Sequence, residues 1–548
     1  MKKNLLVFFV LLCQFSAFAQ NQYLVVFKDK ANSTYAVSNP KQFLSERSIQ
    51  RRAKQKIAIT ERDLPPNVSY LAEISKTGAK ILYKSRWLNA ALVQTDAATL
   101  NKILQLPFVK GLEGAGDIRN ARTNVVLESS APRNKFGIEE GDLFDNGLSA
   151  TQLAMLGADK MHQKGFRGEG MLIGVLDSGF LNADKLSFFK DLFAEKRVVG
   201  TYDFVASELN VYNDHSHGTN VLSCMAAYES GRIVGTAYKA SYLLLRTEDT
   251  SSETKREEAN WLFGAEMADS VGVDVINTSL GYTTFDNPAQ NYKYSDLNGD
   301  YALATRAADW AAQAGILVVA SAGNEGDDSW KYIGTPADAD SIIAVGAVGS
   351  NRVVAGFSSY GPSGDGRIKP ELAAQGFGTL LGTPNNVTSY GNGTSYASPL
   401  LAGFATGFWQ AFPELTNMQV RDYLIRSASQ YENPDDRIGF GIPDFEKASE
   451  IAELDKFIAN LKKQGKDVVV FPNPANSQTD PMKVWVLKDD AGTNFDYKLV
   501  DMTGKTIWSL TTTDKNIILP TKIDYWQTNY ILKVTSENLN FTTKVARN

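Results

Sequence analysis

The sequence is poor in cysteine and histidine. Of its 548 residues only two are cysteines, Cys13 and Cys224, and only three are histidines, His162, His215 and His217. Cys13 lies in an N-terminal segment that we expect to be removed, which leaves Cys224 alone and excludes an intrachain disulfide in the mature chain. Because Cys224 lies in an apolar stretch, we expect a packed core thiol rather than a reactive one.

Apart from its N-terminus, the chain lacks any apolar run of the roughly 20 residues that a transmembrane helix needs. The run from Leu5 to Leu12 is too short to span a bilayer, follows two lysines and precedes Ala17-Phe18-Ala19, a small-x-small cleavage signal. We therefore expect residues 1–19 to be a signal peptide. A lipoprotein site at Cys13 is disfavoured because two leucines precede it where small residues are needed.

The chain also lacks an excess of basic residues. Lysine and arginine total 56 against 61 aspartates and glutamates, a net charge of -5, which argues against nucleic acid as the main partner. A composition of 43% hydrophobic and 21% charged residues is typical of soluble globular proteins. The length exceeds what one core supports, so we expect about three folding units.

Residues 20–120 have the pattern of a small α+β unit. The expected elements are a strand at 23–27, a basic helix at 40–56, strands at 79–83 and 90–94, a helix at 96–104 and a strand from Phe108. This order predicts a ferredoxin-like split arrangement. We interpret the basic helix as a solvated face rather than a binding patch. Residues 121–144 are polar, and we expect an exposed linker suited to proteolytic processing.

Residues 145–455 alternate apolar strands with helical stretches, which predicts a parallel α/β sheet. Buried strands are expected at 171–176, 242–245, 273–277, 316–320 and 342–346, and helices at 217–228, 254–271 and 301–314. Residues 456–466 form a predicted charged linker. Residues 467–548 carry short alternating strands, which predict an all-β sandwich.

Four polar residues stand at the ends of predicted strands or the starts of predicted helices: Asp177, His217, Asn324 and Ser395. Each alone has an ordinary explanation as a cap or turn residue. Ligand sites of open α/β sheets lie at the carboxyl ends of the strands, so we expect the four to meet there. A serine nucleophile needs a base and a group that orients the base, and an oxyanion needs a donor. Together the four residues predict acyl transfer.

The segments around these residues resemble the motifs of the subtilisin family of serine peptidases (subtilases), in that family's order along the chain. The matching segments are 175–179, 276–281 and 321–326, together with His217-Gly218-Thr219 and Asn392–Pro399, within residues 145–452. The resemblance implies that Asp177 orients the base, His217 is the general base and acid, Ser395 is the nucleophile and Asn324 donates to the oxyanion.

The same resemblance implies a substrate cleft and no cofactor for the chemistry. One wall, formed by Ser279, Leu280 and Gly281, would pair with extended substrate. The opposite wall of the S1 pocket would be formed by Ala320, Ser321, Ala322 and Gly323. The chain departs from the family at Asn220, Tyr396 and Leu400, where histidine, methionine and histidine are common. These departures indicate an unusual branch, so pocket preferences of better-known members do not transfer.

The flanking regions resemble accessory domains. Residues 20–115 resemble subtilase propeptides, which assist folding and inhibit the enzyme. The C-terminal region resembles the sorting domain of the type IX secretion system at 470–475, 499–505 and 529–534, with Asn529 where glycine is commoner. This implies export through the periplasm by the secretion machinery, to the outer surface or the medium. The alternative is a sandwich that binds substrate or carbohydrate.

Two weaker patterns leave alternatives open. Asp296, Asn298 and Asp300 have the oxygen spacing of half a calcium loop, without the distal glutamate of an EF-hand, and a helix-capping turn is the alternative. Asp184 is a further candidate for a structural calcium. The acidic stretch 248–258 is interpreted as a solvated helix start, with a cleft edge that favours basic substrates as the alternative.

The sequence therefore predicts a secreted serine endopeptidase made as a preproenzyme. The competing class is a non-catalytic surface adhesin on a subtilase scaffold. An esterase of the α/β-hydrolase type is excluded because it needs serine before aspartate before histidine and a Gly-x-Ser-x-Gly elbow.

Overall fold

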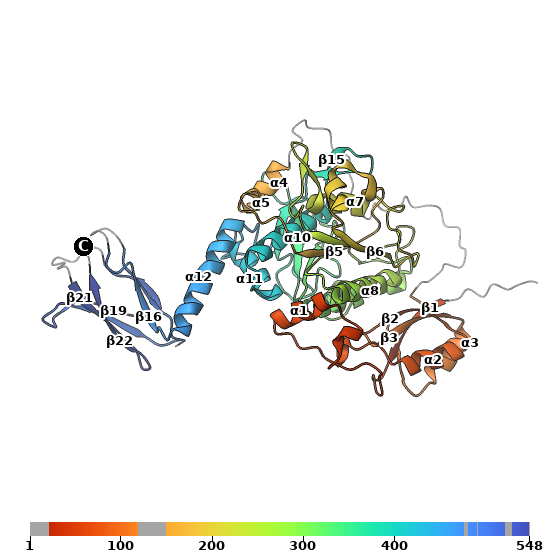
Figure 1. Cartoon of the computed structure of the whole chain (residues 1–548), viewed down its shortest axis with the longest axis horizontal. Coiled ribbons are helices and arrows are strands. Elements are labelled where there is room, and N and C mark those ends of the chain that lie inside the picture. The colour runs from red at the N-terminus through yellow and green to blue at the C-terminus, as the bar shows by residue number, and fades with distance from the viewer. Residues whose placement is uncertain are drawn as a thin grey trace, which may run out of the picture. The chain divides into compact units, whose positions relative to one another are not determined.

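The computed structural model of the protein describes residues 21–114, 116–118, 149–475, 481–489, 492–520 and 529–546 (Figure 1). The predicted signal peptide, residues 1–19, and the predicted processing linker, residues 121–144, lie outside the described residues. The chain forms two compact units, residues 1–449 and residues 450–548.

The first unit begins with a four-stranded antiparallel sheet in the order β2-β3-β1-β4. Its strands are β1 (Asn21–Phe27), β2 (Lys80–Ser85), β3 (Ala90–Thr95) and β4 (Val109–Leu112). Ile74 of α2 (Val68–Lys76) and Ile103 of α3 (Ala97–Leu104) pack with Val25 and Val93 in one apolar cluster. This is the predicted ferredoxin-like order.

One helix of this small unit starts later than the sequence predicted, and another was missed. The predicted helix at 40–56 is a short 3-10 turn, η1 (Pro40–Gln42), followed by α1 (Glu46–Lys54), which lies outside the apolar cluster of the small sheet. The helix that covers this sheet is α2, which the sequence interpretation missed. α2 carries Val68, Leu71 and Ile74 at near-helical spacing, a pattern that the sequence interpretation did not use.

A seven-stranded parallel sheet follows in the order β13-β12-β11-β10-β5-β9-β6. Its strands are β5 (Leu172–Asp177), β6 (Val198–Asp203), β9 (Ser241–Arg246), β10 (Val275–Thr278), β11 (Leu317–Ser321), β12 (Ile343–Val348) and β13 (Leu372–Gln375). The five central strands were predicted. The two missed strands, β6 and β13, are the sheet edges, where burial is incomplete or the strand is short.

Helices cover both faces of this sheet, as the predicted α/β class requires. Leu176, Ile276 and Val318 pack with α8 (Lys255–Val271) and α9 (Leu303–Gln313) in one cluster. Figure 1 shows α7 (His217–Ala226) and α8 on opposite sides of β5 and β6. The central helix α10 (Thr394–Ala411) packs against α7 and against β10 to β13. The remaining helices are α4 (Ala150–Met155), α5 (Ala158–Gln163), α6 (Lys190–Ala194) and α11 (Asn417–Ser427).

Two small hairpins complete the first unit: β7 (Tyr228–Glu229) with β8 (Ile233–Val234), and β14 (Thr379–Gly382) with β15 (Thr388–Gly391). The stretch predicted as a charged linker, residues 456–466, is helical as far as Lys463, because α12 spans Phe445–Lys463. Ile451, Leu454, Ile458 and Leu461 recur at helical spacing there, a pattern that the high charge concealed.

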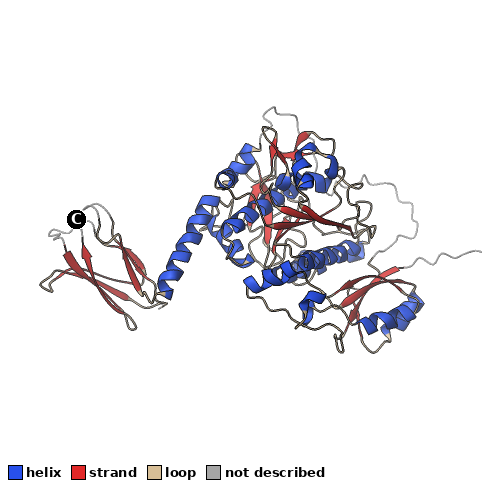
Figure 2. Ribbon diagram, viewed as in Figure 1, coloured by secondary structure: helices blue, strands red, loops and turns tan. Residues whose placement is uncertain are grey.

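The second unit carries two antiparallel sheets, as predicted (Figure 2). One contains β16 (Val468–Phe471), β17 (Lys483–Val486) and β20 (Asn516–Ile518); the other contains β19 (Thr506–Thr512), β18 (Phe495–Val500), β21 (Asn529–Thr535) and β22 (Asn540–Ala546). Val484, Tyr497 and Leu532 lie in their shared apolar core. Within the described ranges, no helix has the length and apolar character needed to cross a membrane.

Candidate active site

The parallel sheet places the predicted polar residues at one edge. Asp177 is the last residue of β5, and Asn324 follows β11 by three residues. His217 is the first residue of α7, and Ser395 is the second residue of α10. Since parallel strands end at a common edge, these elements carry the four side chains to the same region.

Asp177 and His217 form a fully buried pair. The Nδ1 atom of His217 lies 2.8 Å from Oδ1 of Asp177, and both side chains are 0% exposed. Oδ1 also accepts bonds from the backbone N–H of Ser178 at 2.7 Å and from its hydroxyl at 3.2 Å. A carboxylate can only accept, so Nδ1 of His217 carries the proton and Nε2 of the neutral ring is the basic nitrogen.

A glycine allows this close arrangement. A Cβ atom on Gly218, the second residue of α7, would lie 2.3 Å from the carbonyl oxygen of Gly179. Such a contact cannot exist, so only glycine lets the start of α7 approach the backbone that follows Asp177.

Ser395 is held at the buried start of α10. Its Oγ lies 3.5 Å from the carbonyl oxygen of Ser279, and the Ser279 hydroxyl donates to the Ser395 carbonyl at 2.9 Å. The Asn277 amide donates to Ser279 Oγ at 3.2 Å, and Ser398 Oγ donates to Asn277 Oδ1 at 2.8 Å. The first turn of α10 is therefore fixed to the end of β10. Backbone N–H groups in that turn have no helical acceptor and favour negative charge.

Two departures from the family pattern lie in the core of this region. Tyr396 is fully buried, and its ring centroid lies 6.0 Å from that of His217, which brings the starts of α10 and α7 together. Leu400 is also fully buried. Tyr396 therefore packs beside the candidate base His217.

The side chain of Asn324 has a fixed orientation. Its Oδ1 accepts the backbone N–H of Thr394 at 2.9 Å and the Thr394 hydroxyl at 3.0 Å. An N–H can only donate, so the atom facing Thr394 is the oxygen and the amide NH2 points the other way. The preceding Gly323 has φ +115°, and a Cβ there would lie 2.5 Å from Glu325 Oε2. The loop thus presents a donor beside the residue that precedes Ser395.

The predicted cleft walls follow neighbouring strands. β10 pairs with β11 from Val275–Leu317 to Thr278–Ala320, so residues 279–281 and 320–323 lie side by side at the same edge. Leu280 is buried and Gly281 is exposed, which leaves backbone at this position accessible. The elements therefore place the candidate base His217, the candidate nucleophile Ser395 and the candidate oxyanion donor Asn324 at the same edge of the sheet as this backbone.

Three residues around Asp177 had no role in the sequence interpretation: Ser178, His215 and Arg246. Ser178 Oγ lies 3.1 Å from His215 Nδ1, and Arg246 Nε donates to the Ser178 carbonyl at 3.1 Å. Ser178 was visible only as the neighbour of Asp177, and His215 only as a second histidine before His217. Their contacts depend on the meeting of β5, α7 and β9.

Two of the four calcium candidates, Asp296 and Asn298, cap turns. Asp296 Oδ2 accepts the backbone N–H of Lys293 at 2.9 Å, and Asn298 Oδ1 accepts those of Asp300 at 3.1 Å and Tyr301 at 3.2 Å. Asp184 lies in the short turn η3 (Ala183–Lys185). No group of three or more His, Cys, Asp or Glu suited to a metal ion occurs among the residues that the structure describes. A structural calcium remains a prediction.

The acidic stretch 248–258 is not the solvated helix start that was predicted. Glu248, Glu257 and Glu258 are all buried. Glu257 accepts the Thr254 backbone N–H at 3.0 Å in a capping box, and Tyr292 donates its hydroxyl proton to Glu258 at 2.6 Å. These carboxylates are buried because N–H and O–H donors from the surrounding loops satisfy them.

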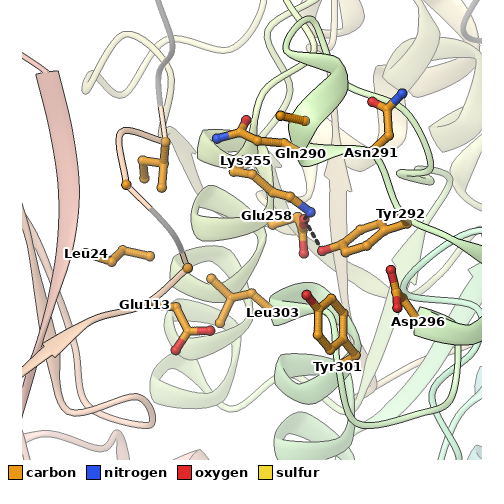
Figure 3. Close-up of a pocket in the computed structure, with 14 residues that line it drawn as sticks. Leu24, Glu113, Lys255, Glu258, Gln290, Asn291, Tyr292, Asp296, Tyr301 and Leu303 are labelled. Carbon is orange, nitrogen blue, oxygen red and sulfur yellow. Dashed lines mark hydrogen bonds and ion pairs between the residues drawn. The ribbon is translucent and has the colours of Figure 1, made fainter.

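A cavity of about 330 Å³ lies away from the proposed triad, where β1 and β4 meet the loops before α9 (Figure 3). In it Lys255 Nζ lies 2.8 Å from Glu258 and 3.2 Å from the centroid of the Tyr292 ring. Burial lowers the pKa of Lys255, and Glu258 opposes this. Because the Lys255 ammonium is already paired with Glu258, we interpret the cavity as a packing gap between the N-terminal four-stranded sheet and the part of the chain that carries the seven-stranded sheet.

That interface is held by arginines. Asp269, buried in the last turn of α8, pairs with Arg51, with Arg52 at 2.8 Å and with Arg86 at 2.5 Å. Burial raises the pKa of Asp269, but the three guanidinium groups outweigh burial and the net pKa is lowered. The prediction that the basic helix presents a solvated face is wrong, since Arg51 and Arg52 are only 6% and 3% exposed.

Comparison with known proteins covers both parts of the first unit. A family model described as "Subtilase family" matches residues 168–441, and one described as "Peptidase S8 propeptide domain, Bacteroidota" matches residues 22–130. The chain is similar to Subtilisin DY of Bacillus licheniformis, with 33% identity over 279 residues, 50% of this chain and 90% of that protein. It is similar to Subtilisin NAT of Bacillus subtilis subsp. natto, with 31% identity over 364 residues, 66% of this chain and 81% of that protein.

A solved structure is also similar, the "Crystal structure of MycP1 from the ESX-1 type VII secretion system". The TM-score is 0.45 and the identity 20%, over 57% of this chain and 91% of that chain.

Proposed function

Because the chain belongs to the subtilase family and is a subtilisin-like serine peptidase, we propose that it is a secreted endopeptidase whose triad is Asp177, His217 and Ser395. The observation that carries the assignment is the buried 2.8 Å bond between His217 and Asp177. A buried carboxylate bonded to one imidazole nitrogen leaves the other nitrogen as a base, which is the arrangement a serine nucleophile needs.

In the proposed mechanism Ser395 Oγ attacks the peptide carbonyl while His217 Nε2 takes its proton. Asp177 holds the ring in this tautomer and stabilises the imidazolium that forms. The oxyanion is bound by the Asn324 amide and the Ser395 backbone N–H. His217 then protonates the leaving amine, and water hydrolyses the acyl-enzyme by the same steps. The fixed orientation of Asn324 by Thr394 supports its part.

Substrate binds as an extended strand in this proposal. Ser279, Leu280 and Gly281 pair with its backbone, and Ala320, Ser321, Ala322 and Gly323 form the opposite wall of the S1 pocket. The adjacency of β10 and β11 supports this assignment. Peptide hydrolysis by this triad needs no cofactor, and calcium would act only in the structure.

In this proposal the N-terminal domain inhibits the enzyme and the C-terminal domain directs its export. The N-terminal unit is a propeptide that inhibits the peptidase until it is cut away, which its buried arginine contacts with α8 support. The C-terminal sandwich addresses the chain to the secretion machinery and thereby to the outer surface or the medium. The two antiparallel sheets support this only at the level of fold.

The assignment is tested with Ser395→Ala in the processed protein. We expect complete loss of peptide hydrolysis and of labelling by a serine-directed phosphonate, with an unchanged melting temperature. Full residual hydrolysis would remove Ser395 from the role. A wild-type protein that is processed, folded and still inert to the phosphonate would favour the adhesin instead.

A further inference from the structure

A second histidine lies beside the proposed catalytic pair. Nδ1 of His215 accepts the backbone N–H of His217 at 3.2 Å and lies 3.1 Å from the hydroxyl of Ser178. A backbone N–H can only donate, so Nδ1 must hold a lone pair and the neutral ring carries its proton on Nε2. His215 therefore touches both the first residue of α7 and the residue after Asp177.

Ser178 connects His215 to Asp177. Its side chain is fully buried, and its hydroxyl lies 3.2 Å from Asp177 Oδ1 and 3.1 Å from His215 Nδ1. A hydroxyl has one proton, so it can donate to only one of these acceptors at a time. Arg246 also holds Ser178, because its Nε donates to the Ser178 carbonyl oxygen at 3.1 Å. The hydroxyl proton can therefore move between Asp177 and His215 without a change in the positions of the heavy atoms.

We propose that His215 is a positioning residue for the proposed triad, and that only its neutral form supports catalysis. This rests on the proposed roles of Asp177, His217 and Ser395. Neutral His215 holds the His217 backbone through Nδ1. It also competes with Asp177 for the Ser178 proton, which limits the bonds that the carboxylate receives.

Protonation of His215 reverses these contacts. Adding one proton at Nδ1 removes the acceptor for the His217 N–H, and the new N–H donates to Ser178 Oγ. The Ser178 proton must then go to Asp177 Oδ1, which places an imidazolium one hydroxyl away from the carboxylate. The carboxylate becomes a weaker partner for His217, and the start of α7 loses its hydrogen bond.

Asp214 and Arg246 are two charged groups near His215 that pair with each other. Asp214, its neighbour in the chain, binds Arg246 at 3.1 Å, and Arg246 also binds Asp203 at 2.8 Å. Asp177 is reached through Ser178, and His217 through the backbone. Imidazole is the side chain that ordinarily changes its charge between pH 5 and 8, so His215 is the group here suited to sense that range.

The test is the pH dependence of kcat and KM on a peptide substrate, with active sites counted by phosphonate titration. Wild type should lose kcat in acid with a slope approaching two, for His217 and His215. In His215→Asn the amide oxygen can replace Nδ1 as acceptor but does not titrate, so we expect a slope of one and kcat at pH 8 within about threefold of wild type.

His215→Ala removes the acceptor altogether. We expect kcat at pH 8 to fall about tenfold with little change in KM, since two hydrogen bonds lose their partner. His162→Asn is the matched control, because His162 contacts the Thr236 carbonyl rather than any residue of this group, and it should keep the slope of two.

The outcomes separate this proposal from the triad itself. If Ser395→Ala stays active, the triad assignment fails whatever His215 does. If Ser395→Ala is inert and His215→Asn loses kcat in acid with the same slope as wild type, the proposal for His215 is overturned and the triad stands. A normal kcat in His215→Ala would also overturn it.

Discussion

The contact of Asp269 with three arginines predicts how tightly the N-terminal unit holds the peptidase. We consider Asp269→Asn in the processed enzyme and the N-terminal unit added back as a separate inhibitor. In the complex the substitution leaves Arg51, Arg52 and Arg86 buried without their shared carboxylate. Removing one partner of a buried ion pair costs about 3–5 kcal/mol.

The arginines keep other hydrogen-bond acceptors, so we expect the loss of binding free energy to lie at the lower end of this range. Arg52 still binds Asp63 at 2.7 Å, and Arg86 still binds the Glu266 carbonyl at 2.9 Å. A loss of about 3 kcal/mol corresponds to roughly a hundredfold increase in the inhibition constant. The free enzyme should not suffer, because a carboxylate in the last turn of a helix is disfavoured by the helix dipole.

The measurement is the inhibition constant for peptide hydrolysis at neutral pH, with Asp274→Asn as the matched control. The Arg47 side chain that pairs with Asp274 is 41% exposed, although Asp274 itself is 14% exposed, and a pair open to solvent on one side contributes about 1 kcal/mol, or roughly fivefold. Because the pKa of Asp269 is lowered in the complex, its contribution is present at neutral pH and is lost as the pH falls through that lowered pKa. Acid should therefore weaken inhibition more in wild type than in Asp269→Asn. An inhibition constant within threefold of wild type at neutral pH would refute the reasoning.

Two further substitutions test the site and the sheet. Asn324→Ala should lower kcat by roughly 10²–10³-fold with little change in KM, and an unchanged kcat would remove Asn324 from the oxyanion role. Asp309 in α9 accepts the Ser341 N–H at 2.9 Å, and burial raises the pKa of Asp309 to about 7. A raised carboxyl pKa costs native stability as the pH rises from about 4 to 7, so Asp309→Asn should raise Tm by roughly 2–5 °C at pH 8. The gain should vanish at pH 4, and an equal gain at both pH values would contradict the assignment.

The sequence predicted the centre of the large sheet because its strands are continuous apolar runs. It failed at β6 and β13, since edge strands are partly exposed or short and lose that signal. It also failed at α2, although Val68, Leu71 and Ile74 recur there at near-helical spacing.

Residues of the site were predictable where the chemistry has a local signature. Asp177 ends an apolar strand, Ser395 lies in a helix start after Gly393, and His217 begins a helix just before Gly218. The contacts of His215 and Arg51 could not be predicted, because their partners, Ser178 and Asp269, come from elements far away in the chain. Only the assembled sheet brings such groups together, so burial of a charge could not be inferred from local composition.

The strand order of the large sheet has a consequence for the lifetime of the enzyme. In β5, Ile173 pairs with Tyr242 on one side and with Val275 on the other. Such distant pairings require large loops to close before any sheet contact is gained, which slows folding. A chain that unfolds after the N-terminal unit has gone must therefore pass this slow step again before it regains the sheet. We therefore expect the working lifetime of the processed chain to be set by its unfolding rate rather than by its equilibrium stability.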